Sequence, residues 1–133
     1  MKTFRDLFIW QKAMTLVTYT YQITEKFPKE ELFGLTSQIR RSAISIPSNI
    51  VEGFGRDSNK EFSRFIIIAI SSLFEFQTQI EIAKNINYLN ENEFKSIYEE
   101  TREACRPRPH SFRCRPSGAS WPWPRIRNAS RGN

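Results

Sequence analysis

The sequence predicts an all-α protein, an up-and-down four-helix bundle formed by residues 1–104 and followed by a tail of residues 105–133. Apolar residues recur at steps of three and four, which is the spacing of one helix face. No stretch of useful length alternates apolar and polar residues as a strand does. Proline and glycine segments divide the periodic part into four helices, expected at about residues 5–27, 35–54, 59–87 and 91–104.

The first helix is expected over residues 5–27, with Asp6 as its N-cap. Pro28 ends it, because the residue before a proline is disfavoured in the helical region. Its predicted buried face consists of Trp10, Ala13, Met14, Val17, Tyr21 and Thr24.

The second helix, residues 35–54, has an apolar face made of Leu35, Ile39, Ala43, Ile46, Ile50 and Phe54. Pro47 cannot donate a hydrogen bond to the carbonyl of Ala43, which predicts a kink. A polar stripe runs along the opposite face: Gln38, Arg41, Ser45, Ser48 and Glu52, with Ser37 and Asn49 beside them. We expect either a recognition surface or a hydrogen-bond network buried across the bundle or an oligomer interface, since buried Arg and Glu must be paired.

The third helix begins at the capping pattern Ser58-x-x-Glu61 and is expected to reach residue 87. Its core seam is Phe62, Ile66, Ala69, Leu73, Phe76, Ile80, Ala83 and Asn87. Further apolar residues lie outside the seam: Phe65, Ile67, Ile68, Ile70, Phe74, Ile82 and Ile86. Three partner helices cannot cover them all, and burying each side chain is worth about 1.5–3 kcal/mol. The helix therefore predicts self-association through this surface.

The fourth helix, residues 91–104, opens at Asn90 with Glu93 three residues later. It is expected to bury Phe94, Ile97 and Tyr98 and to stop before the proline-rich run of residues 106–109.

Charge is divided unequally between the body and the tail. Residues 1–104 carry 13 Lys and Arg against 14 Asp and Glu, so the formal charge of +6 comes from seven arginines in residues 105–133. The composition also changes at residue 105: residues 1–104 are rich in amino acids with AT-rich codons, and the tail is rich in amino acids with GC-rich codons. This predicts an origin in foreign DNA or a shifted reading frame, which a comparison of codon usage on the two sides of codon 105 would test. A natural, disordered Arg/Pro-rich tail is the alternative.

The residue types give little support to catalysis. Residues 1–104 contain no His and no Cys, which excludes imidazole bases, thiolate nucleophiles and the usual zinc ligands there. In the tail, Cys105, His110 and Cys114 form an incidental set without a fourth ligand. We therefore expect no enzyme, cofactor, metal site or small-molecule substrate. The longest apolar run, residues 65–70, is too short for a membrane span, and the N-terminus lacks a signal-like segment, so we expect a cytoplasmic protein without a membrane partner.

Several ordered motifs point to one family: Trp10-Gln11-Lys12-Ala13, residues 27–31, residues 33–41, residues 45–56 and Glu61-Phe62-x-Arg64-Phe65. Residues 3–104 closely resemble the 23S rRNA intervening-sequence protein family, also called four helix bundle proteins. The resemblance implies a small bacterial protein, encoded within 23S rRNA genes or elsewhere, that folds as an up-and-down bundle and forms a ring-shaped homopentamer. The accessory variability proteins of diversity-generating retroelements are similar to this family, and their association with nucleic acid suggests a binding role.

The chain departs from this family where the fourth helix should continue. Members extend that helix by several turns rich in Leu and Ile, whereas the helical period here stops near residue 104. We therefore expect one end of the bundle to be left uncovered, with a weaker ring.

Two functions remain open. In the first, a basic patch repeated around the ring binds RNA or DNA phosphates. Its candidate residues, predicted to cluster near the turn between the second and third helices, are Arg40, Arg41, Arg56, Lys60 and Arg64. In the second, the protein is an oligomeric scaffold that binds only protein, and these residues form internal or interface ion pairs.

Overall fold

A computed structural model describes residues 3–104, and within this range all regular structure is helical. A short 3-10 turn, Phe4–Asp6, precedes α1 (Phe8–Thr24), and a second turn, Lys29–Glu31, precedes α2 (Leu35–Phe54). The last two helices are α3 (Asn59–Asn85) and α4 (Glu91–Ala104). The predicted all-α class with four helices is confirmed, while the expectations for residues 105–133 lie outside the described residues.

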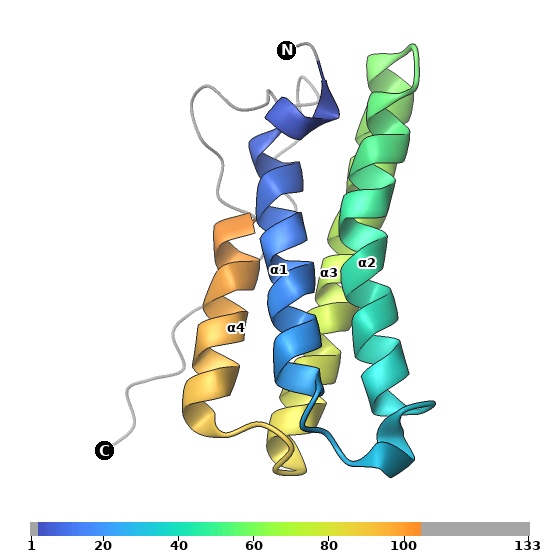
Figure 1. Ribbon diagram of the computed structural model, residues 1–133. Coiled ribbons are helices and arrows are strands. Elements are labelled where there is room, and N and C mark those ends of the chain that lie inside the picture. Colours follow the sequence, from blue (N-terminus) through green and yellow to red (C-terminus); the bar gives the residue numbers. More distant parts are fainter. Residues whose placement is uncertain (1–2, 105–133) are drawn as a thin grey trace, which may run out of the picture.

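The four helices lie side by side, and each runs antiparallel to the next along the chain (Figure 1). α1 packs against α2 and α4, and α3 packs against the same two helices, with α2 and α3 forming the most extensive pair. At about 1.5 Å per residue, the 27 residues of α3 span about 40 Å and the 14 residues of α4 about 21 Å. α4 therefore accompanies only about half of α3.

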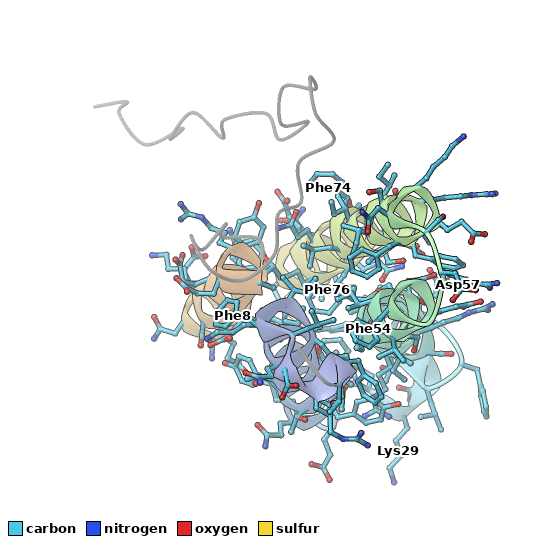
Figure 2. All side chains as sticks on the ribbon, turned by 90° about the horizontal axis from the view of Figure 1, so that it is seen from above. Phe8, Lys29, Phe54, Asp57, Phe74 and Phe76 are labelled. Carbon is cyan, nitrogen blue, oxygen red and sulfur yellow. The ribbon has the colours of Figure 1, made fainter. Side chains whose placement is uncertain are left out.

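The core lies along the axis between the helices. Its fully buried side chains include Leu16 from α1, Ile39 from α2, Phe76 from α3 and Ile97 from α4. The predicted seam of α3 is buried from Ile66 to Ala83, and its first member, the Phe62 side chain, is partly buried. Figure 2 shows Phe76 pointing into the bundle and Phe74, two residues earlier, pointing away from it.

The prediction for α1 needs three corrections. The helix begins at Phe8 and ends at Thr24, and Asp6 caps the preceding 3-10 turn by bonding to the Thr3 amide. Met14 and Tyr21, expected to be buried, are exposed. Ala13 and Thr24 are buried as predicted, and Trp10 and Val17 are partly buried. The other buried residues of the helix are Leu16, Thr20 and Ile23.

Two threonines on the buried face of α1 have their hydroxyls bonded to their own helix. The hydroxyl of Thr20 donates to the carbonyl of Leu16 at 2.7 Å, and that of Thr24 to the carbonyl of Thr20 at 2.7 Å. A hydroxyl satisfied by its own helix can be buried at little cost. An apolar pattern therefore does not reveal that Thr20 is buried, whereas Thr24 was included in the predicted face.

α2 has the predicted bounds, with Pro47 buried inside it. Four residues of its predicted face are buried, and Leu35 and Phe54 are partly buried. Two features bring it close to α3. A Cβ added to Gly53 would lie 2.7 Å from the Cβ of Phe65, so only glycine permits this approach. In the buried contact, the Ser42 hydroxyl bonds to Gln79 Oε1 at 2.7 Å, which fixes the register of the two helices.

α3 ends at Asn85, two residues before the predicted end. Asn87 has a φ of 64°, in the left-handed region that asparagine tolerates better than most residues. The Asn87 amide donates to the carbonyl of Lys84 at 3.0 Å, and the Tyr88 amide donates to the carbonyl of Ala83 at 2.8 Å. This pair of hydrogen bonds is a Schellman motif, which turns the chain toward α4.

α4 has the predicted bounds and start. The Asn90 amide donates to the Glu93 carboxylate at 3.1 Å, and the Glu93 amide donates to the Asn90 side chain at 2.8 Å. Glu93 also pairs with Lys26, just beyond the end of α1. Thr101 Oγ1, near the other end of α4, accepts from Gln77 Nε2 at 2.9 Å. These contacts attach α4 to α1 and to the second half of α3.

Replacing Phe76 with alanine should lower the free energy of unfolding by about 3–5 kcal/mol, because it removes a fully buried aromatic ring and leaves a cavity. Phe33→Ala removes the same ring from the surface and should change stability by less than about 0.5 kcal/mol. Urea denaturation followed by circular dichroism measures both. Equal losses in the two variants would contradict the assigned core.

The Glu93 pair predicts a pH dependence of stability. The hydrogen bond from Lys26 is the main reason that the pKa of Glu93 lies below its ordinary value of 4.5. A lowered pKa stabilises the folded state above pH 4.5, and this contribution is lost as the pH falls through the folded-state pKa. Glu93→Gln should therefore lower the Tm at pH 7 and have a smaller effect at pH 3. A Tm difference that does not change with pH would contradict this assignment.

Candidate functional site

The polar stripe of α2 faces outward and bonds mainly to its own helix. The hydroxyls of Ser45 and Ser48 donate to the carbonyls of Arg41 and Ile44, at 2.9 and 2.8 Å. Asn49 Nδ2 donates to the carbonyl of Ser45 at 2.7 Å. Gln38, Arg41, Ser48 and Glu52 are exposed. Within residues 3–104 these side chains therefore do not form the network that was expected as one alternative across the bundle, and an oligomer interface stays a prediction.

The five basic candidates do not form one cluster. Arg40 and Arg41 lie near the start of α2, about 24 Å along the helix from Arg56 at 1.5 Å per residue. Arg40 turns toward α1, where its Nε donates to Thr24 Oγ1 at 2.9 Å and its guanidinium lies 4.5 Å from the ring centre of Tyr21. It is thus part of the α1–α2 contact, whereas Arg41 is exposed.

The other three cations, Arg56, Lys60 and Arg64, lie at the α2–α3 turn and are exposed. Arg56 bonds to Glu52 at 3.0 Å and lies over the ring of Phe65 at 5.1 Å. Lys60 and Arg64 have no ion-pair partner among residues 3–104. The basic candidate site is therefore reduced to this turn, where Glu52, Asp57 and Glu61 offset much of the charge.

The surplus apolar residues of α3 divide by exposure. Phe65 and Ile70 are partly buried, whereas five others are exposed: Ile67 at 60%, Ile68, Phe74, Ile82 and Ile86. Residues seven apart share a helix face. Ile70 therefore lies on the same face of α3 as Gln77, the face that contacts α4, and Ile67 and Phe74 lie next to this face. Ile82 and Ile86 follow Gln79, which faces α2. α3 thus exposes apolar side chains on two different sides.

Within residues 3–104, α3 is also the one helix long and apolar enough to cross a membrane. A helix in a bundle core can have the same length and composition. The finding therefore does not by itself indicate a membrane protein.

Sequence reasoning missed two features that the structure brings out. Leu32 and Phe33 lie side by side in the loop before α2, and Phe33 is 94% exposed. Two consecutive large apolar residues between predicted helices were the available signal. The second feature is the Ser42–Gln79 hydrogen bond, which no local pattern reveals because its residues lie on different helices.

The described residues offer no metal centre. No group of three His, Cys, Asp or Glu side chains comes together between residues 3 and 104. Cys105, His110 and Cys114 lie outside the part of the chain that the structure describes.

The fold and these surfaces define the class of protein, a small antiparallel four-helix bundle with exposed apolar side chains on its longest helix. The chain belongs to the 23S rRNA-intervening sequence protein family, whose model matches residues 5–107. The family resemblance drawn from the motifs is thereby confirmed.

A solved structure shares this fold: a protein of unknown function from the S23 ribosomal protein family of Bacteroides thetaiotaomicron. The two chains are 22% identical, the match covers 72% of this chain and 90% of the other, and the TM-score is 0.65. No curated protein matches the chain.

Arg40→Ala should lower the free energy of unfolding by about 1–2 kcal/mol, because it removes a charged hydrogen bond and a cation–π contact between α1 and α2. Arg41→Ala is the matched control, since Arg41 is exposed, and should change stability by less than about 0.5 kcal/mol. Urea denaturation measures both. If the two variants are equally stable, the structural role of Arg40 is wrong.

Proposed function

We propose that this protein is a non-enzymatic, self-associating scaffold of the bacterial cytoplasm, assembled as a homopentamer. The exposed apolar side chains of α3 carry the proposal. Five large apolar residues of one helix remain exposed in the single chain, and burying apolar surface gains about 25 cal/mol per Å². The number five rests on the family resemblance alone.

The outer surface of α2 supports an assembly of this kind. Its polar stripe runs beside α3, where Ile82 and Ile86 are exposed on the side toward α2. Protein interfaces commonly combine an apolar centre with a polar rim that makes hydrogen bonds. The exposed side chains of Gln38, Arg41 and Glu52 would supply such a rim.

A second candidate function is nucleic-acid binding by Arg56, Lys60 and Arg64, favoured by the lack of ion-pair partners for Lys60 and Arg64. One copy offers few positive charges beside the three acids of the same turn. A ring would repeat the site around its axis, and phosphate affinity rises with each neutralised contact. Such contacts would be with phosphates and would not read the base sequence.

Self-association is measured by analytical ultracentrifugation of the full chain under reducing conditions. We expect one species of several copies at micromolar concentration. Ile82→Ser combined with Ile86→Ser should weaken it, whereas Met14→Ser, a control of similar exposure on α1, should not. A wild-type chain that stays monomeric at about 100 μM would contradict the scaffold, because a specific interface of standard size would be formed at that concentration.

Nucleic-acid binding is tested on residues 1–104, because the seven tail arginines bind polyanions whatever the fold does. The measurement is fluorescence anisotropy of a labelled RNA at several salt concentrations. Arg56→Ala with Lys60→Ala should weaken binding and lower the salt slope by about 1 per lost contact. Lys95→Ala with Arg102→Ala removes the same charge from α4 as a control. Binding that vanishes with the tail would leave only the scaffold.

A further inference from the structure

The loop between α1 and α2 exposes two apolar side chains, Leu32 and Phe33. Phe33 is 94% exposed and Leu32 is 49% exposed. Neither residue belongs to a helix face, so the helical pattern of the chain gives them no role. Exposed aromatic side chains that gather with other apolar groups are typical of contact sites between proteins.

The backbone of this loop is held in place. Three backbone amides each donate to the carbonyl three residues earlier: those of Glu31 at 2.9 Å, Leu32 at 3.2 Å and Gly34 at 2.9 Å. The Glu31 carboxylate accepts from the Leu35 amide at 2.9 Å and from the Tyr88 hydroxyl at 3.2 Å. The loop is therefore tied to the start of α2 and to the α3–α4 turn. A preordered loop loses little conformational entropy when its side chains are buried by a partner.

The first half of α3 carries an apolar strip with two cations. Lys60, Arg64, Ile67 and Phe74 are separated by four, three and seven residues, which places them on one side of the helix. Ile67 is 60% exposed and Phe74 41%. Within residues 3–104, α4 lies beside the other half of α3, since Thr101, near its end, contacts Gln77. We call these four residues the α3 strip.

The loop and the α3 strip are complementary in charge as well as in apolar character. Residues 29–33 carry one Lys and two Glu, and Glu30 has no ion-pair partner within residues 3–104. The strip carries two cations, Lys60 and Arg64, that are likewise without an ion-pair partner in this range. The α1–α2 loop and the start of α3 lie at opposite ends of the bundle, so they cannot meet within one chain (Figure 1).

We propose that Leu32 and Phe33 of one copy pack on the α3 strip of a second copy, with Glu30 facing Lys60 and Arg64. This inference rests on the proposed self-association and names its contact. Because the two surfaces differ, the contact is head-to-tail, and such contacts form a ring when the rotation closes and an open filament when it does not. Lys60 and Arg64 are then used between copies and are not available to phosphates.

The test uses two variants of the full chain under reducing conditions. The loop variant is Leu32→Ser with Phe33→Ser, and the strip variant is Ile67→Ser with Phe74→Ser. Each alone should assemble at least about tenfold more weakly, as loss of central apolar contacts does in other interfaces. Ile44→Ser, on α2, is the matched control and should assemble normally. Circular dichroism verifies that each variant is folded.

A mixture of the loop variant and the strip variant gives the sharpest result. One intact loop and one intact strip remain, so a head-to-tail contact predicts a 1:1 dimer that cannot grow further. If the strip variant does not fold, Lys60→Glu with Arg64→Glu replaces it. In the same chain, Glu30→Lys should then partly restore the assembly that these two changes weaken.

The outcomes separate the two proposals. A monomeric wild-type chain overturns self-association and this contact together. A wild-type oligomer with unaffected variants overturns only the contact, and so does a mixture that forms no dimer. Weaker assembly of both variants, with a 1:1 dimer in the mixture, supports the contact.

Discussion

The packing of α3 against α2 is the contact on which the rest of the bundle depends. Gly53 lets the two helices approach closely near their turn, and the buried Ser42–Gln79 bond fixes their register farther along. The central side chain of α3, Phe76, is then fully buried between the helices. α1 packs on α2, α4 packs on α3, and α1 and α4 also contact each other. An error in the register of the α2–α3 pair would therefore misplace both.

The two ends of the bundle are stabilised to different degrees. At one end, the Lys26–Glu93 ion pair and the Tyr88–Glu31 hydrogen bond join the loops to each other. At the other end, within residues 3–104, α2 and α3 continue beyond α4, and α3 exposes apolar side chains there. In a single copy, the end with the α1–α2 loop and the α3–α4 turn is therefore held together by contacts between them. The opposite end exposes apolar side chains of α3, which is the physical basis of the proposed assembly.

The charged residues acquire different roles through their neighbours. Arg40 and Arg41 are adjacent in sequence, yet Arg40 holds α1 and α2 together while Arg41 is exposed. Lys60 and Arg64 stay unpaired within the described bundle, which leaves them for contacts with another molecule. The net charge of the chain therefore does not measure the capacity of the bundle to bind nucleic acid, because all of the excess positive charge lies in the tail.

The sequence by itself determined the four helices, the seam of α3 and the capping of α4, because these depend on local periodicity and on side chains three or four residues apart. The seven surplus apolar residues of α3 were also readable from its pattern. Only the tertiary structure decided the buried face of α1, the inward turn of Arg40 and the separation of the basic candidates. These depend on which helices meet and at what rotation, and a local period does not encode contacts between distant residues.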